Sequence, residues 1–182
     1  MTLARRAFLR TSGAALLAAG TPGGIRSAWA APLPRRLKFE NLHTGEKLAL
    51  DYWCDGAYQP EALAAINKVL RDFRTGDVHA MDPRLLDLLH DVNARLETAE
   101  PFQVISGFRS PITNAALHGQ SSGVASKSLH MQGMAIDIRV PGRKLTALHS
   151  TALSLGRGGV GLYPTSDFVH VDVGRVRKWN GV

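Results

Sequence analysis

Residues 128–138 read SLHMQGMAIDI and bring a histidine, a glycine and an aspartate together in a short apolar stretch. Asp137 lies between two isoleucines, in a run whose alternation predicts a β-strand. A carboxylate buried in such a strand is costly unless it is paired or binds a metal. His130 offers a second metal-ligating side chain, and Gly133 allows the backbone to turn between the two. The stretch therefore predicts a strand that carries part of a metal site.

A second strand offers the third ligand that such a site needs. Residues 166–174 read SDFVHVDVG, and the period of a strand places His170 and Asp172 on one face and the valines on the other. We expect the valines to enter the core and the polar pair to face a pocket, with Asp167 nearby at the start of the strand. The other five histidines are expected to be ordinary polar residues: His43, His79, His90, His118 and His149.

The remaining pattern predicts an α+β fold, with a small antiparallel sheet and helices packed on it. A turn at residues 44–46 predicts a β-hairpin, and Asp82 is placed to cap a helix that begins at Pro83. The other expected helices are 59–74, 111–117 and 144–155, and the other expected strands are 102–106, 134–140, 158–164 and 168–174. Residues 119–128 are small and polar, which is typical of a loop.

Residues 1–30 have the features of a twin-arginine export signal. Arg5 and Arg6 precede a short apolar run, and residues 28–30 read AWA, a small-x-small cleavage pattern. The sequence thus predicts a signal at 1–30, a leader at 31–37 and one domain at 38–182, located in the periplasm. An uncleaved membrane anchor is the alternative, but glycine and proline interrupt the apolar run, and we expect no stable membrane insertion after cleavage.

Composition excludes few functions but limits some. The 182 residues include 22 basic and 15 acidic residues, a net charge of +7. Four arginines and no acidic residue lie in 1–30, so the rest of the chain carries only +3. This modest charge does not call for a nucleic-acid partner. The single cysteine, Cys54, excludes an intrachain disulfide and is interpreted as structural. We expect a monomer.

Three motifs in order resemble the zinc D,D-peptidases of the VanX and VanY types and their hedgehog-like relatives. The stretch SLHMQGMAID (128–137) matches the pattern S-x-H-x-x-G-x-A-x-D, and SGFRS (106–110) is similar to the family's arginine motif. The segment GVGLYPTSDFVHVDVGRVRKW (159–179) is similar to the C-terminal part of the murein endopeptidase K branch. The resemblance covers residues 38–180, and three motifs together are far more specific than one.

The resemblance implies a role for each matching residue. His130, Asp137 and His170 become the ligands of one Zn²⁺ per chain, which leaves a coordination position for water. Arg109 becomes the cation that faces the substrate, and Ser128 helps to orient the substrate. A structural salt bridge is the alternative role for Arg109.

The general base is the least determined residue. An acid three residues before the last histidine has this role in the VanX-like branch, which favours Asp167. Asp172 is the rival, either as the base or as a carboxylate that holds the other nitrogen of a ligand histidine.

The expected activity is that of an exported zinc metallopeptidase acting on peptidoglycan. It would cut peptide crosslinks or stem peptides, at amide bonds between D-configured centres. Two alternatives share the same residues: a non-catalytic zinc module that only binds wall peptides, and a D,D-carboxypeptidase that trims free termini. Structural zinc sites are usually closed by four protein ligands, so three ligands favour an enzyme.

Overall fold

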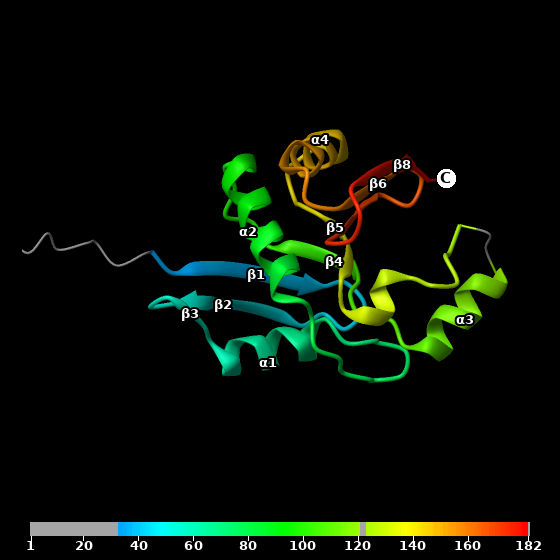
Figure 1. Cartoon of the computed structure of the whole chain (residues 1–182), viewed down its shortest axis with the longest axis horizontal. Coiled ribbons are helices and arrows are strands. Elements are labelled where there is room, and N and C mark those ends of the chain that lie inside the picture. Colours follow the sequence, from blue (N-terminus) through cyan, green and yellow to red (C-terminus); the bar gives the residue numbers. More distant parts are fainter. Residues whose placement is uncertain (1–32, 121–122, 182) are drawn as a thin grey trace, which may run out of the picture. The chain divides into compact units, whose positions relative to one another are not determined.

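One mixed sheet organises the domain (Figure 1). Within residues 33–120 and 123–181, which the computed structural model describes, eight strands lie in the order β3-β2-β1-β4-β5-β7-β6-β8. They are β1 (Arg35–Asn41), β2 (Lys47–Cys54), β3 (Ala57–Tyr58), β4 (Phe102–Ser106), β5 (Ala135–Arg139), β6 (Gly159–Tyr163), β7 (Phe168–Asp172) and β8 (Arg177–Asn180). The predicted export signal at 1–30 lies outside the described residues.

The α+β class is confirmed, and so is the hairpin of β1 and β2. The sheet is larger than expected, and the pairs β1–β4 and β6–β8 are parallel. The segment between β3 and β4 carries two helices, which lets β4 return beside β1 in the same direction. Two short strands, β3 and β8, were not predicted. Strand β1 begins at Arg35, inside the segment 31–37 expected to be a leader, because Arg35 pairs with Trp53 of β2.

Four α-helices and one 3₁₀-helix complete the described part of the chain: α1 (Pro60–Val69), α2 (Pro83–Leu96), α3 (Pro111–Gln120), η1 (Leu129–Gln132) and α4 (Leu145–Leu155). Helix α2 begins as predicted, since the Asp82 side chain accepts a hydrogen bond from the backbone N–H of Arg84. Helix α1 ends before residue 74, its expected end. The carboxylate of Asp72 instead accepts hydrogen bonds from the N–H groups of Arg74 and Ser110, which folds this segment toward α3.

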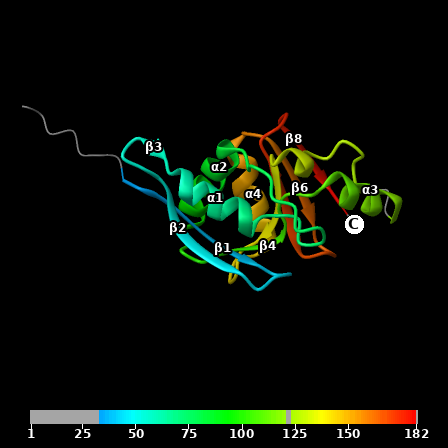
Figure 2. The same cartoon turned by 90° about the horizontal axis from the view of Figure 1, so that it is seen from below.

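Three helices build the core. In Figure 2, α1, α2 and α4 lie together, and α3 lies apart from them. Helices α2 and α4 pack on each other, α2 contacts β1, and α4 contacts β6 and β7. Side chains from the central strands are fully buried in this core: Leu37, Phe39, Phe102, Val104, Ile136, Ile138, Val169 and Val171. Among the described residues, no helix is long and apolar enough to cross a bilayer.

Candidate metal centre and cleft

Asp137 and His170 lie directly opposite each other on two paired strands. Strands β5 and β7 are antiparallel, and their register pairs Asp137 with His170. Because the isoleucines of β5 and the valines of β7 point into the core, strand alternation turns these two side chains to the other face. Asp137 Oδ1 lies 2.8 Å from His170 Nδ1. The register of β5 with β7 therefore brings two of the three candidate ligands together.

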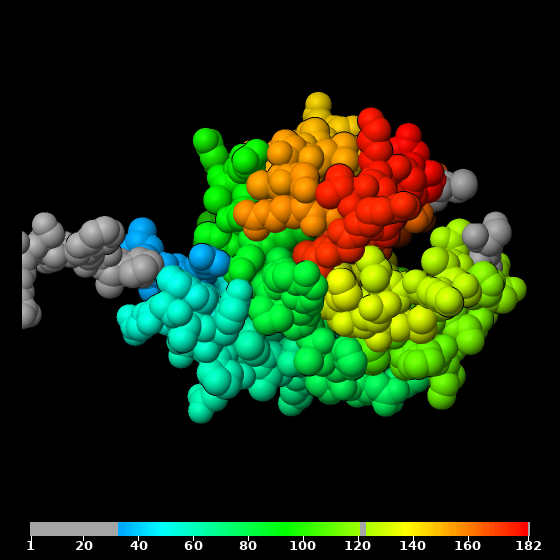
Figure 3. Space-filling view, viewed as in Figure 1, coloured from blue at the N-terminus to red at the C-terminus, as the bar shows by residue number. Residues whose placement is uncertain are grey.

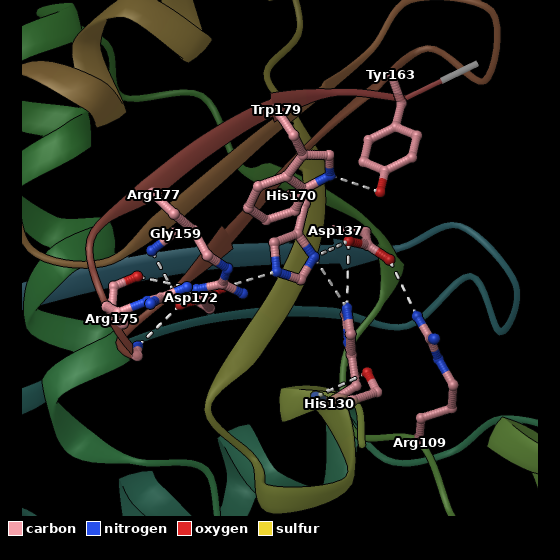
Figure 4. A network of polar contacts seen from close by, with 12 residues as sticks. Arg109, His130, Asp137, Gly159, Tyr163, His170, Asp172, Arg175, Arg177 and Trp179 are labelled. Carbon is pink, nitrogen blue, oxygen red and sulfur yellow. Dashed lines mark hydrogen bonds and ion pairs between the residues drawn. The ribbon is translucent and has the colours of Figure 1, made fainter. Parts of the chain in front are cut away.

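His130 reaches the same point from the 3₁₀-helix η1. Ser128 caps this helix, as its hydroxyl oxygen accepts a hydrogen bond from the backbone N–H of His130. Gly133 ends the helix at φ 66°, and a Cβ there would lie 2.2 Å from the carbonyl oxygen of Ala80. His130 Nε2 lies 3.3 Å from Asp137 Oδ1. Short loop geometry thus brings the third side chain to the pair on the sheet (Figure 4).

The hydrogen bonds around the two imidazoles set their tautomers. His130 Nδ1 lies 2.7 Å from the carbonyl oxygen of Gly107, so this nitrogen carries the proton. His170 Nε2 lies 3.1 Å from the carboxylate of Asp172, which favours a proton there. The lone pairs of His130 Nε2 and His170 Nδ1, 3.2 Å apart, then face each other and Asp137 Oδ1.

Three acceptor atoms at this distance repel one another unless a cation lies between them. One ligand atom from each of His130, Asp137 and His170 lies within 4.8 Å of the others, and among the described residues this is the one such group. Two imidazole nitrogens and one carboxylate oxygen are a donor set that suits zinc and leaves a position for water. The residues present therefore fit a divalent metal, and the other five histidines lie outside the group.

Burial and neighbouring charges shift the pKa values of all three side chains. Burial raises the pKa of Asp137, but the two histidines outweigh burial and hold this pKa far below its usual range. Burial lowers the pKa of His130. Burial also lowers the pKa of His170, but hydrogen bonds to Asp137 and Asp172 raise it to about 9. The site is thus negatively charged at Asp137 and attracts a positive charge, a proton or a metal ion.

Asp172 is fully buried on the side of His170 that faces away from Asp137. Its Oδ1 accepts hydrogen bonds from the backbone N–H groups of Gly159 and Gly174, at 2.9 and 2.8 Å. Its Oδ2 also accepts from Arg177 Nη2 at 2.7 Å. Burial raises the pKa of Asp172, but these donors and His170 together hold it well below its usual range. Asp172 is therefore an ionised carboxylate whose oxygens are already occupied.

Asp167 lies at the surface, away from the three candidate ligands. Its side chain is 59% exposed, its backbone has a φ of 56°, and its carboxylate forms an ion pair with Arg139 on β5. The described residues that line the cleft do not include Asp167. The structure thus brings neither of the two acids expected as the base, Asp167 and Asp172, to the three facing ligand atoms.

A cleft of about 320 Å³ opens over the three ligands. Figure 3 shows the hollow between the C-terminal strand, in red, and the segment before β5, in yellow. Its lining includes the residues expected from the motifs and others that were not predicted: Arg109, residues 123–125, Lys127, Ser128, Leu129, His130, Asp137, Tyr163, Phe168, His170, Arg177 and Trp179. Arg109 is 9% exposed, and its Nη2 lies 3.3 Å from Asp137 Oδ2. Arg109 therefore both forms a salt bridge and faces the cleft.

Sequence reasoning missed the aromatic wall of this cleft, formed by Tyr163, Phe168 and Trp179. Phe168 lies two residues before His170 on the same strand, so the period of the strand was a signal for its place in the cleft. Trp179 lies on a strand of four residues, RKWN, which has no regular apolar alternation. Only its pairing with β6 brings it beside His170.

Comparisons with known proteins show the family of the chain. A family described as peptidoglycan L,D-endopeptidase MepK matches residues 29–179. The peptidoglycan L,D-endopeptidase MepK of Escherichia coli K12 is 42% identical over 175 residues, which is 96% of this chain and 96% of that protein. A probable peptidoglycan L,D-endopeptidase MepK of Haemophilus influenzae is 42% identical over 180 residues, 98% of this chain and 96% of that protein.

Proposed function

Because the chain belongs to the peptidoglycan L,D-endopeptidase MepK family, we propose that it is an exported, zinc-dependent endopeptidase that cuts peptides of peptidoglycan. One observation carries the zinc dependence: two imidazoles and one carboxylate converge on a single point at the floor of a cleft. Three protein ligands with an open position are typical of a catalytic zinc ion, whereas structural zinc is usually closed by four.

The bond cut is the amide between an L-configured and a D-configured centre. The names of the relatives support this choice, whereas the motif resemblance alone implied a bond between D-configured centres. In the hydrolysis, the oxygen of a water molecule bonds to the carbonyl carbon, and the C–N bond breaks. Both protons of the water end on the leaving nitrogen, so that a carboxylate and an ammonium group are the products.

The metal would supply a Lewis acid and an acidified water molecule when bound. The chain's own contribution is to hold its ligands in place. The carbonyl oxygen of Gly107 fixes the ring of His130, and the carboxylate of Asp172 fixes the ring of His170. Ser128 caps the short helix that carries His130, which gives it a positioning role in addition to its place in the cleft.

Asp172 is proposed as a positioning residue rather than the base. Its two oxygens accept hydrogen bonds from two backbone N–H groups and from Arg177, and it contacts His170 on the side away from the ligand atoms. A base must reach the water that attacks the substrate. Asp167 could reach it only after its ion pair with Arg139 opens, so we assign it no base role.

Arg109 is proposed to bind the substrate. One arm of its guanidinium contacts Asp137, and the side chain lines the cleft beside the ligands. Burial lowers the pKa of Arg109 from its ordinary value, while Asp137 opposes this change. A buried guanidinium next to the reacting carbonyl group can stabilise negative charge as it develops on the oxygen.

A carboxypeptidase remains the second candidate, because three cationic side chains line the cleft: Arg109, Lys127 and Arg177. Such cations would also bind the free carboxylate at the end of a stem peptide. The two activities differ in their products, since a carboxypeptidase releases one terminal amino acid and an endopeptidase separates two peptides.

The proposed location is the periplasm, reached through the twin-arginine signal expected at residues 1–30. The relatives that act on peptidoglycan support this location. We propose that the exported domain works as a monomer, because all three ligands come from one chain.

Digestion of purified crosslinked muropeptides, with products identified by mass spectrometry, tests this function. Zinc-loaded protein should cut an L,D-amide bond and release two peptides, and a chelator or His170→Ala should abolish the cleavage. Release of a single terminal amino acid would instead identify a carboxypeptidase. Binding of muropeptides without any cleavage would identify a binding module.

A further inference from the structure

We propose that Tyr163 is a further catalytic residue, whose hydroxyl donates a hydrogen bond to the carbonyl oxygen of the bond being cut, and that Trp179 positions this hydroxyl. The inference rests on the proposed peptidase function and deepens it. Neither residue belongs to the metal site, and both line the cleft together with His130 and Asp137. In Figure 4, the hydroxyl of Tyr163 extends toward Asp137, and the indole of Trp179 lies beside His170.

The hydrogen bond between the two residues has a fixed direction. Trp179 Nε1 lies 2.9 Å from the hydroxyl oxygen of Tyr163. An indole N–H can only donate, so the tyrosine oxygen must accept this bond. The hydroxyl proton of Tyr163 is then directed to another acceptor. The carbonyl oxygen of a peptide bound in the cleft is such an acceptor.

The ring of Tyr163 is held in place before any substrate binds. It stacks on Phe168, with ring centroids 4.5 Å apart and an interplanar angle of 18°. The two residues are direct partners in the pairing of β6 with β7. On the other side, Gly181 approaches so closely that a Cβ there would lie 2.0 Å from the tyrosine ring. A donor fixed in this way needs little reorganisation when charge develops on the substrate.

Trp179 is held equally firmly, by strand β8. Its pairing partner on β6 is Gly161, where a Cβ would lie 2.4 Å from the indole ring. Gly161 is also the partner of His170 on β7, which explains why the indole and imidazole centroids are 5.2 Å apart. The guanidinium of Arg177 lies 4.9 Å from the centre of the indole ring. The absence of a side chain at Gly161 therefore allows the indole of Trp179 to lie over β6 and reach the hydroxyl of Tyr163.

The chemistry suits a phenol. A phenol hydroxyl can donate a hydrogen bond without carrying a charge. A hydrogen bond to the carbonyl oxygen becomes stronger as negative charge develops there during attack by water. Loss of one such donor typically lowers kcat by about 100- to 1,000-fold.

The test compares three variants and one control variant in the zinc-loaded protein. Tyr163→Phe keeps the ring stack and removes only the hydroxyl, and should lower kcat for crosslinked muropeptides by ~100-fold with little change in KM. Trp179→Phe should lower kcat less. In the double variant, Trp179→Phe should add nothing to the effect of Tyr163→Phe, since both act through one hydrogen bond. Tyr58→Phe is the matched control, because it removes a hydroxyl bonded to Asp87 outside the cleft and should leave kcat unchanged.

A second readout is binding of a phosphinate that replaces the scissile amide of a peptidoglycan peptide. Tyr163→Phe should weaken the binding of this tetrahedral anion far more than it raises KM. If Tyr163→Phe weakened phosphinate binding only as much as it raised KM, or if it kept full kcat, the role of Tyr163 would be overturned while the proposed function stands. Additive effects of the two substitutions would overturn the role of Trp179. Absence of cleavage by the wild-type protein would overturn the proposed function and this inference with it.

Discussion

Asp172 and Arg177 form a two-point ion pair behind the candidate metal site. Arg177 Nη2 lies 2.7 Å from Asp172 Oδ2, and Arg177 Nη1 lies 3.1 Å from Asp172 Oδ1. The same carboxylate contacts His170 Nε2 at 3.1 Å. Strand β8 thus supports His170, the proposed metal ligand of strand β7, through a carboxylate that is fully buried.

Asp172→Asn should weaken zinc binding, because the neutral amide holds the His170 ring less firmly than the carboxylate does. Loss of such a supporting contact typically lowers metal affinity by about 10- to 100-fold. Competition with a zinc chelator of known affinity measures the effect, with Asp167→Asn as the control that should keep wild-type affinity. If Asp172 were the base instead, zinc affinity would stay the same and only kcat would fall.

His130→Ala and His170→Ala should each abolish zinc retention and muropeptide cleavage together, because two remaining ligands hold the ion poorly. The matched control is His90→Ala, which removes a histidine from helix α2 outside the ligand group. Zinc content by elemental analysis and product release by mass spectrometry provide the measurements. Cleavage by a verified metal-free preparation would eliminate the mechanism.

Asp167→Asn should retain turnover within about twofold of the wild type, since its carboxylate is paired with Arg139 at the surface. A general base contributes about 100- to 10,000-fold to the rate. The two roles are therefore easily separated by kcat at saturating muropeptide. A fall of that size with zinc still bound would show that the ion pair opens and that Asp167 is the base.

Gly133→Ala should destabilise the protein by more than Gly142→Ala. Both glycines have positive φ, 66° and 70°, so each substitution has a backbone cost of about 1–2 kcal/mol. Only at Gly133 does the new Cβ also meet a backbone atom, 2.2 Å from the carbonyl oxygen of Ala80. Urea unfolding compares the two free energies, and equal losses would contradict the crowding seen here. Gly133→Ala should also lower zinc affinity, because it shifts His130.

The carboxylate of Asp72 should make stability depend on pH in the acid range. Burial raises its pKa, but hydrogen bonds from Thr113 and Ser110 outweigh burial and lower the pKa to about 2. Because this folded-state pKa lies below that of the unfolded chain, the stabilisation is complete above pH ~4 and is lost as the pH falls toward 2. It amounts to about 2 kcal/mol.

Asp72→Asn should remove this pH dependence. Urea unfolding between pH 2 and pH 6 gives the free energy of unfolding of each protein. The two free energies should differ most above pH 4 and converge near pH 2. A difference that stays constant across this range would contradict the assignment. Zinc should be absent in both samples, so that titration of the metal ligands affects the two proteins equally.

Local patterns predicted much of this molecule because their physics is local. The alternation of residues in β5 and β7 follows from the geometry of a single strand, and the Asp82 cap needs only the first turn of its helix. Helix α1 was predicted too long because the Asp72 carboxylate, inside the expected helix, accepts a hydrogen bond from the backbone N–H of Ser110, 38 residues away. The helical spacing of apolar residues in this segment carries no information about that contact.

The sequence alone determined which residue types were available for the site: a histidine and an aspartate in each of two segments, and the strand face of Asp137, His170 and Asp172. Only the tertiary structure decided which of them meet. The register of β5 with β7 joins Asp137 to His170, and Arg139 draws Asp167 away. Parallel pairing of β8 with β6 places Trp179 beside Tyr163. No short segment of sequence could show this contact, because the pairing of distant strands depends on the whole sheet.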